Sequence, residues 1–269
     1  QLPYFDYKCP ACEKELENKL VRKHDEKVEC PSCKADMQKQ VLRMIGDPAK
    51  RYREDPIRML RAIRFAAKTG FKLDVATSAP IAKLGKLIHD VPAARLFDEI
   101  LKLLMSGYSW AAIQGLKDAG LHHGVLPLLD QILDSKETSK EAHDFVRIAL
   151  ANTDQRIQSG KSVSAGFLFA TLLWPDLLRN WKKNLAKGIS NIPALHDAMD
   201  ETIASQSNGM VIQRRFESDM REIWSMQPRF EKRVGRYPYR LIESPRFRAG
   251  YDFMLLRCAT GEQNPAIGE

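Results

Sequence analysis

Apolar residues recur every three or four positions along most of the chain from about residue 45 onward. This spacing predicts a series of amphipathic helices, separated by short stretches that contain glycine, proline or asparagine. The predicted helices span residues 58–68, 93–105, 109–119, 140–157, 163–173, 211–225 and 246–258. Only the first forty residues alternate apolar and polar positions in the manner of strands. The sequence therefore predicts a mostly α fold with a small N-terminal β module.

The composition is that of a globular protein. Hydrophobic residues make up 44% of the 269 positions and charged residues 28%, which excludes collagen-like, low-complexity and intrinsically disordered chains. The longest apolar stretch, residues 165–174, is about half as long as the ~20 residues that a membrane-spanning helix needs. The chain opens with Gln-Leu-Pro-Tyr-Phe-Asp and shows no export leader. We therefore expect a cytoplasmic protein of bacterial type, or one from an organelle of bacterial descent, with no membrane partner.

Four of the five cysteines form two C-x-x-C pairs, Cys9 with Cys12 and Cys30 with Cys33, separated by seventeen residues. This spacing is typical of a zinc site, in which two tight turns supply four thiolates to one tetrahedral Zn²⁺ ion. Two disulfides are the alternative, which a chain without a leader does not favour. A closed shell of four thiolates leaves no position for a substrate, so we expect a structural zinc. Residues 3–9 and the two Cys-Pro-x-Cys turns also resemble the FmdB-type zinc ribbon of bacteria.

The net charge of +8 is concentrated in one segment. Residues 39–72 contain ten basic and three acidic side chains, a local net charge of +7. A solvated helix face would normally interleave acids with the bases. Concentrated positive charge suits phosphates, because each neutralised phosphate releases a counterion. The segment therefore predicts RNA, or a nucleotide such as ATP, as a partner.

A helix start is predicted inside this basic segment. Asp55 would cap the helix with its carboxylate, and Pro56 would occupy the first helical position. One side of the helix is apolar and consists of Ile57, Leu60, Ile63 and Ala67. Another side carries a ladder of cations at three- and four-residue spacing, formed by Arg58, Arg61, Arg64 and Lys68. We expect Arg64 and Lys68 to bind RNA.

Residues 43–65 resemble the neck of the class II nucleotidyltransferases, the bacterial poly(A) polymerases and CCA-adding tRNA nucleotidyltransferases. Glu54, Asp55 and Arg58 match their neck motif Glu-Asp-x-x-Arg. The resemblance implies that Asp55 and Arg58 bond the base edge of an incoming nucleotide, and that Arg61 lies near the base or the phosphates.

The same resemblance extends to about residue 260. It implies that Arg51 and Arg53 help to hold the nucleotide or the RNA backbone. Residues 92–104 look like the body helix that follows the neck, and residues 152–157 and 245–252 look like later segments of the poly(A) polymerase branch. We therefore expect three domains: a zinc ribbon over 1–42, a helical neck over 43–120 that binds nucleotide and RNA, and a helical body and leg over 121–269 that bind RNA.

Nucleotidyl transfer with two metal ions needs paired carboxylates, and no Asp-x-Asp occurs in the 269 residues. In the resembling family these carboxylates lie in a head domain before the neck. We therefore expect a head-less relative, inactive alone, that binds RNA or nucleotide as an adapter or component of an RNA-processing assembly with protein partners. One alternative is a part of a working nucleotidyltransferase, for polyadenylation or tRNA 3′-end CCA addition, whose head lies on another chain or was lost; only then would Mg²⁺ be needed. The other is a structural subunit of a ribonucleoprotein.

Several single residues have plainer interpretations. Cys258 lies in an apolar helical pattern and is predicted to pack in the core. Residues 153–155 are predicted to form a helix end. The tryptophans are predicted to be mostly core or interface residues; they are Trp110, Trp174, Trp181 and Trp224.

Overall fold

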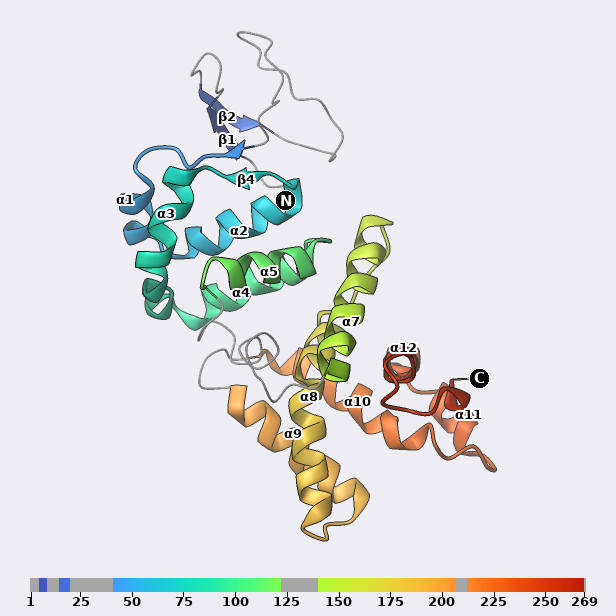
Figure 1. Cartoon of the computed structure of the whole chain (residues 1–269). Helices are drawn as coiled ribbons and strands as arrows, with labels where there is room; N and C mark the ends of the chain where they lie inside the picture. Colours follow the sequence, from blue (N-terminus) through green and yellow to red (C-terminus); the bar gives the residue numbers. More distant parts are fainter. Residues whose placement is uncertain (1–4, 9–14, 20–40, 122–139, 207–211, 269) are drawn as a thin grey trace. The chain divides into compact units, whose positions relative to one another are not determined.

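The computed structural model describes residues 5–8, 15–19, 41–121, 140–206 and 212–268, which are mostly helical (Figure 1). The predicted mostly α fold is therefore confirmed. The chain divides into two compact units. Unit 1 comprises Gln1–Val91 with Ala111–Leu121, and unit 2 comprises Pro92–Trp110 with His122–Glu269. The predicted domain limits near residues 42 and 120 stay predictions.

Two antiparallel strands, β1 (Phe5–Lys8) and β2 (Glu15–Lys19), form the described part of the N-terminal module. Strand structure is therefore present where apolar and polar positions alternate. The predicted zinc ligands lie outside the described residues, so the zinc ribbon stays a prediction; these ligands are Cys9, Cys12, Cys30 and Cys33.

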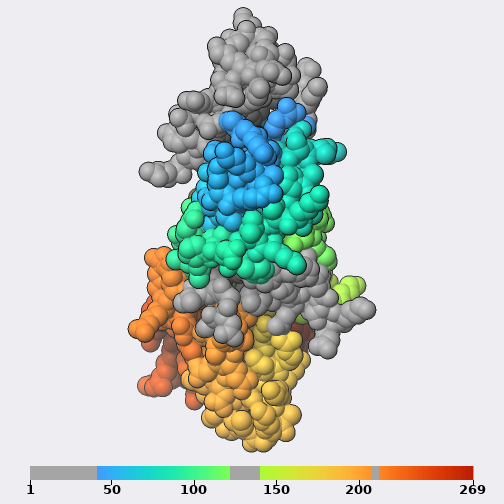
Figure 2. All heavy atoms as spheres, turned by 90° about the vertical axis from the view of Figure 1, so that its left-hand side faces the viewer, coloured from blue at the N-terminus to red at the C-terminus, as the bar shows by residue number. Residues whose placement is uncertain are grey.

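The helices of unit 1 include the two that form most of the basic segment, residues 39–72. The helices of this unit are α1 (Pro48–Glu54), α2 (Ile57–Thr69), α3 (Val75–Leu84), the 3₁₀ helix η1 (Gly85–Asp90) and most of α5 (Ser109–Asp118). α1 packs against α3, and the two lie side by side on the face of this unit that Figure 2 shows. Tyr52 of α1 is completely buried, and its hydroxyl donates to the carbonyl of Thr77 in α3 over 2.9 Å. This hydrogen bond fixes α1 in place.

α2 follows the predicted pattern closely. Ile57, Leu60 and Ile63 are buried, whereas Ala67 is only half-buried. α5 approaches this helix at Gly115, where an added Cβ would lie 2.8 Å from the Cγ2 atom of Ile63. A glycine is therefore needed for the close approach. α2 ends at Gly70, whose φ of 70° is in the left-handed region that glycine adopts at little cost.

A pair of two-residue strands departs from the expectation that the chain is helical beyond about residue 45. β3 (Val41–Leu42) runs parallel to β4 (Lys72–Leu73), and α1 and α2 form the crossover that a parallel pair requires. The backbone N–H of Asp74 continues the pairing by donating to the carbonyl of Leu42 over 2.8 Å. A strand this short has no periodicity of its own, so the pattern of apolar residues could not predict it.

Unit 2 is organised around one long helix, α8 (Ala165–Ala186). The helices packed against it are α7 (Lys140–Gln158), α9 (Asn191–Gln206), α10 (Arg214–Met226) and α12 (Phe247–Ala259). α4 (Ala93–Leu104) adds Phe97, whose ring stacks on Phe169 of α8 with centroids 5.6 Å apart. The chain closes with the 3₁₀ helix η2 (Gln227–Arg229), α11 (Tyr237–Ile242) and the 3₁₀ helix η3 (Pro265–Ile267).

The seven predicted helices are present, with one large difference in extent. The helix predicted over 163–173 continues through Pro175 to Ala186. Trp174 and Leu177 on either side of the proline are buried, so packing outweighs the missing backbone hydrogen bond. The prediction for the tryptophans is confirmed in three cases, since Trp174, Trp181 and Trp224 are buried and Trp110 is half-buried.

Candidate nucleic-acid interface

The cation ladder of α2 lies beside its buried apolar side. Arg58, Arg61, Arg64 and Lys68 are all partly exposed. The guanidinium of Arg64 lies 4.4 Å from the centre of the Phe65 ring. Burial, followed by the charge of Arg64, lowers the pKa of Lys68 below the usual value for lysine. An anion that approaches cations crowded in this way lowers their electrostatic repulsion.

The turn between α1 and α2 brings the residues of the matched motif together. The Nε atom of Arg58 lies 3.9 Å from the Oδ2 atom of Asp55, and both side chains remain partly exposed. The backbone N–H of Asp55 donates to the carbonyl of Arg51, which closes α1, and the carbonyl of Asp55 accepts from the N–H of Arg58. An acceptor and a donor therefore sit next to each other at the start of α2.

The predicted cap position of Asp55 is wrong by one residue. The N-cap of α2 is Pro56, whose φ of −60° and ψ of −25° are already helical, whereas Asp55 is extended and serves as the C-cap of α1. The carboxylate cap occurs instead at the preceding Asp-Pro pair, where Asp47 accepts from the N–H of Ala49 over 2.9 Å. Of the two aspartates that precede a proline, Asp47 thus caps α1, and Asp55 links α1 to α2.

The two arginines of α1 flank the buried Tyr52 and differ in exposure. Arg53 is exposed, and Arg51 is half-exposed with its Nη1 atom 3.6 Å from a carboxylate oxygen of Glu54. Within the described residues, the Nε atoms of Arg51 and Arg58 are buried without a hydrogen-bond acceptor. Of the seven predicted nucleotide- and RNA-binding residues, six lie on two consecutive helices of one unit, and Asp55 lies in the turn between these helices.

Metal ligands were predicted only in residues 1–42. In the part of the chain that the structure describes, no three or more histidine, cysteine and carboxylate side chains gather as a metal site would require. The four predicted cysteine ligands lie outside that part, so they are neither confirmed nor contradicted.

Asp154 has a role that the sequence pattern does not indicate. It lies inside α7, which continues to Gln158, so the predicted helix end at residues 153–155 is wrong. The carboxylate accepts from the backbone N–H of Ser109 over 2.8 Å and from that of Trp110 over 3.3 Å. It therefore caps the start of α5 from a distant part of the chain, and burial raises its pKa above the usual value.

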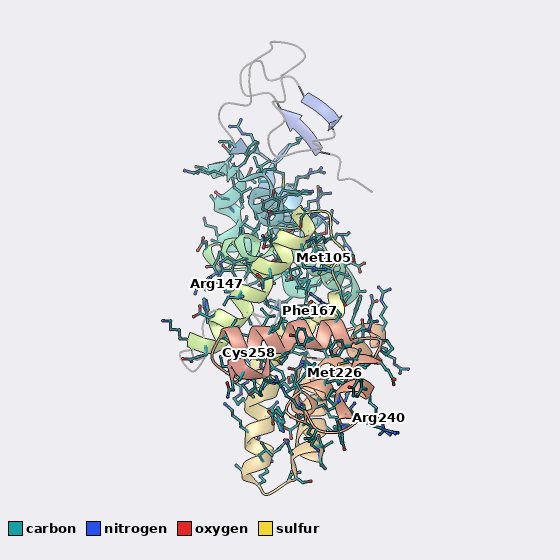
Figure 3. The ribbon with its side chains drawn as sticks, turned by 90° about the vertical axis from the view of Figure 1, so that its right-hand side faces the viewer. Met105, Arg147, Phe167, Met226, Arg240 and Cys258 are labelled. Carbon is teal, nitrogen blue, oxygen red and sulfur yellow. The ribbon has the colours of Figure 1, made fainter. Side chains whose placement is uncertain are left out.

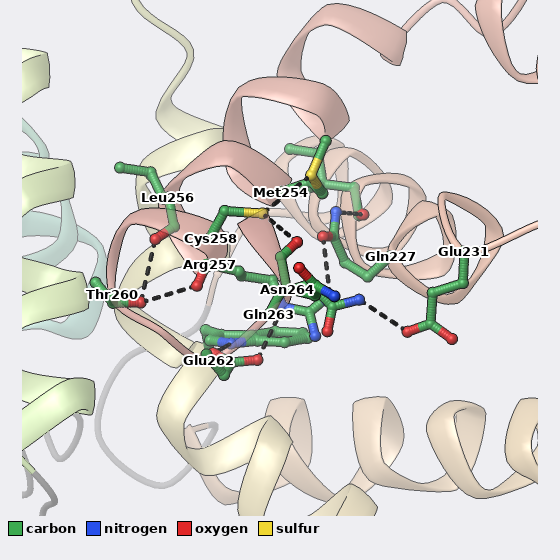
Figure 4. A network of polar contacts seen from close by, with 12 residues as sticks. Gln227, Glu231, Met254, Leu256, Arg257, Cys258, Thr260, Glu262, Gln263 and Asn264 are labelled. Atoms are coloured by element: carbon green, nitrogen blue, oxygen red, sulfur yellow. Dashed lines mark hydrogen bonds and ion pairs between the residues drawn. The ribbon is translucent and has the colours of Figure 1, made fainter. Parts of the chain in front are cut away.

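A second polar cluster anchors the C-terminal segment of unit 2 (Figure 4). The Nε atom of Arg257 donates to Glu262 over 2.8 Å, and the Arg257 guanidinium lies 4.9 Å from the Trp174 ring centre. The indole N–H of Trp174 donates to the other oxygen of Glu262 over 2.7 Å. Cys258 beside them is partly buried against a hydrophobic cluster, which agrees with its predicted packing role. These groups satisfy one another, so we assign them to the fold.

Two family descriptions match separate parts of the chain. Residues 70–133 match a family described as "Probable RNA and SrmB- binding site of polymerase A". Residues 187–269 match a family described as "Polymerase A arginine-rich C-terminus". None of the described helices combines the length and apolar character needed to cross a bilayer.

Curated relatives show the same similarity over longer stretches. The chain is 37% identical over 228 residues to poly(A) polymerase I of Escherichia coli O6:H1, which covers 84% of this chain and 49% of that protein. It is 38% identical over 219 residues to poly(A) polymerase I of Haemophilus influenzae, covering 80% and 48%. A CCA-adding enzyme of Anoxybacillus flavithermus is 29% identical over 143 residues, covering 53% and 33%. The chain thus spans about half the length of the polymerases it matches.

Proposed function

Because the helical part of this chain belongs to the family of bacterial poly(A) polymerases and CCA-adding tRNA nucleotidyltransferases, we propose that it binds RNA through the cation ladder of α2 and the arginines of α1. The observation that carries this proposal is the division of α2 into a buried apolar side and a partly exposed basic side. RNA phosphates are the partner for which such a ladder is suited, since each neutralised phosphate releases a counterion. The chain acts as an RNA-binding component or adapter of an RNA-processing assembly.

The pair of Asp55 and Arg58 gives this surface a place for a nucleotide. A carboxylate accepts hydrogen bonds and a guanidinium donates them. The edge of a base such as adenine or cytosine presents both a donor and an acceptor, so the pair complements it. The two groups lie 3.9 Å apart and are partly exposed, so a base edge could engage both after a small rotation of the side chains. Arg61, one turn further along α2, is placed to meet the base or its phosphates.

A second candidate function is nucleotidyl transfer, for polyadenylation or CCA addition. The observation that favours it is the coverage of about half of each matched polymerase, together with the Asp55 and Arg58 pair. No Asp-x-Asp occurs in the 269 residues, so the carboxylates that bind two Mg²⁺ ions would have to come from elsewhere. Extension of an RNA primer by the purified chain with Mg²⁺, ATP and CTP would support nucleotidyl transfer by this chain and contradict the RNA-binding proposal. No extension agrees with RNA binding alone, and also with a transferase whose carboxylates are on another chain.

The RNA-binding proposal is tested by measuring affinity for a labelled single-stranded RNA at several salt concentrations. Replacing both Arg61 and Arg64 with Gln should weaken binding to all sequences and reduce the slope of log K against log salt by about 0.7 for each phosphate that is no longer neutralised. Lys83→Gln is the matched control, since Lys83 is an exposed cation on α3 of the same unit. An unchanged slope in the double variant would refute the role of the ladder.

A structural Zn²⁺ on the four N-terminal cysteines remains part of the proposal, supported by their spacing alone. Four thiolates complete one tetrahedral shell and would hold together a module too small to build its own core. A cytoplasmic location, nucleotide binding and protein partners likewise stay predictions.

A further inference from the structure

A second basic surface lies in unit 2, on the segment from Arg229 to Ile242. It contains five basic residues and one acid, a net charge of +4 over fourteen positions. We define the tyrosine–arginine surface as its exposed cationic and aromatic residues: Arg229, Lys232, Arg233, Arg236, Tyr237, Tyr239 and Arg240. None of them belongs to the nucleotide- and RNA-binding residues proposed above, which are in unit 1.

The two tyrosines of this surface are unusually exposed for aromatic residues. Tyr239 is 70% exposed and Tyr237 is 54% exposed. In the described part of the chain, neither hydroxyl has a hydrogen-bond partner, and the only aromatic contact is that of the Lys232 ammonium, 5.5 Å from the Tyr237 ring centre. Tyr251 nearby behaves differently, because it stacks on Phe247 and its hydroxyl donates to the carbonyl of Gly268 over 2.9 Å. Among the described residues, the structure thus uses Tyr251 for packing, places only the Lys232 ammonium over the Tyr237 ring and leaves the Tyr239 ring without a contact.

Several arginines of the surface also lack acidic partners. Among the described residues, no carboxylate pairs with Arg229, Arg236 or Arg240, and Figure 3 shows the Arg240 side chain pointing away from the ribbon. The single acid of the segment, Glu231, accepts instead from the side-chain amide of Gln263 over 2.9 Å (Figure 4). The described residues of the unit therefore leave the positive charge of Arg229, Arg236 and Arg240 without a paired carboxylate.

The backbone beneath these side chains is held in place. Leu241 and Phe230 are buried in a cluster with Met226 and Met254, so α11 is anchored from its inner side. Pro238 lies in the first turn of this short helix and restricts the backbone between the two tyrosines. The exposed rings are thus presented from a fixed support, which reduces the entropy lost when a ligand stacks on them.

From these observations we infer that the tyrosine–arginine surface is a binding site for single-stranded RNA, with bases stacked on Tyr237 and Tyr239 and phosphates bound by Arg236 and Arg240. Exposed aromatic rings next to arginines without a paired carboxylate are suited to bind single-stranded nucleotides, because every base has a face that can stack on a ring and lies next to a phosphate. An acidic protein would meet the charge of this surface but would leave the rings without a stacking partner. Single-stranded RNA satisfies both features.

The test compares three labelled 12-nucleotide probes on the full chain: oligo(A), oligo(U) and an abasic ribose-phosphate strand. Replacing both Tyr237 and Tyr239 with Ala should weaken oligo(A) binding at least about 5-fold and leave the abasic probe unaffected, since stacking is removed but charge is not. The corresponding Phe variants should bind like the wild type. Arg236→Gln with Arg240→Gln should weaken binding of all three probes and lower the salt slope by about 1.4, for two phosphates no longer neutralised.

The control is Arg147→Gln, because Arg147 is an exposed arginine on α7 of the same unit, well apart from Arg240 in Figure 3. Thermal unfolding should be unchanged in all of these variants, as the replaced side chains are exposed. Oligo(A) affinity equal to wild type in the Ala variants would overturn the inference and point to an acidic protein as the occupant. Repeating the series with Arg61 and Arg64 replaced by Gln keeps the two sites distinguishable, because a failed ladder would leave the tyrosine effect intact.

Discussion

Replacing Tyr52 with Phe tests how α1 is held beside the basic ladder. The change removes one hydroxyl from a fully buried side chain and leaves the carbonyl of Thr77 without its 2.9 Å hydrogen bond. The loss of a buried hydrogen bond costs about 1–2 kcal/mol in the free energy of unfolding, since the remaining acceptor stays desolvated. The ring itself is retained, so no cavity contributes. Urea unfolding at pH 8 measures the loss.

The pH dependence of the same variant gives a sharper test. Burial raises the pKa of Tyr52 from 10.0 to about 12, so the folded protein keeps its proton after the unfolded chain has lost it. The free energy of unfolding therefore falls as pH rises from 10 toward 12, and at pH 11 the wild type should have lost about 1.4 kcal/mol through this group. Tyr52→Phe has no proton to lose. The stability difference between the two proteins should shrink or vanish at pH 11.

The comparison between variants cancels the titration of all other groups. Unfolding curves of wild type and Tyr52→Phe at pH 8 and pH 11 give two differences, and the difference at pH 8 should be larger by about 1.4 kcal/mol. Absorbance of the tyrosinate ion provides an independent measure, since the wild type should show one late-titrating tyrosine that the variant lacks. Equal differences at the two pH values would refute the buried hydroxyl as the anchor of α1.

Two further predictions concern other parts of the chain. Asp154→Ala should lower the free energy of unfolding by about 2–3 kcal/mol, because the backbone N–H groups of Ser109 and Trp110 lose their acceptor. Asp154→Asn should lower it by less. Because burial raises the pKa of Asp154, the free energy of unfolding of the wild type should rise relative to that of the Asn variant as the pH falls toward 3.8. Thermal unfolding of both variants measures this, and equal losses would argue against the cap. The purified protein should contain about one Zn²⁺ per chain by elemental analysis, and Cys30→Ser should lose the metal without loss of the helical circular dichroism signal; a full metal content in that variant would exclude Cys30 as a ligand.

Much of the helical structure could be predicted from local sequence. The period of apolar residues located α2, α4, α5, α7, α10 and α12 to within three residues at either end, because each helix buries one continuous stripe. The neck motif placed Asp55 and Arg58 together for a different reason, because the extended residue that ends α1 lies beside the first turn of α2. The buried positions of α2 followed from the same periodicity.

The features that local sequence could not predict depend on distant contacts. Asp154 caps α5 from a position 45 residues away from Ser109, and no local pattern connects the two. α8 continues past Pro175 because Trp174 and Leu177 beside the proline are buried, and the helices packed against α8 come from other parts of the chain. The two Asp-Pro pairs look alike in sequence, yet only Asp47 caps its helix, because Asp55 is already engaged in ending α1.

The two proposed RNA surfaces rely on different interactions, which makes them separable by salt. On α2 the ring of Phe65 already has the guanidinium of Arg64 against it, so the ladder offers mainly charge, and its affinity should fall steeply as counterions accumulate. On the tyrosine–arginine surface the ring of Tyr239 is 70% exposed and has no such cation against it among the described residues, and stacking is far less sensitive to ionic strength than ion pairing. RNA binding that survives at high salt should therefore depend on Tyr239, whereas binding gained at low salt should depend on Arg61 and Arg64.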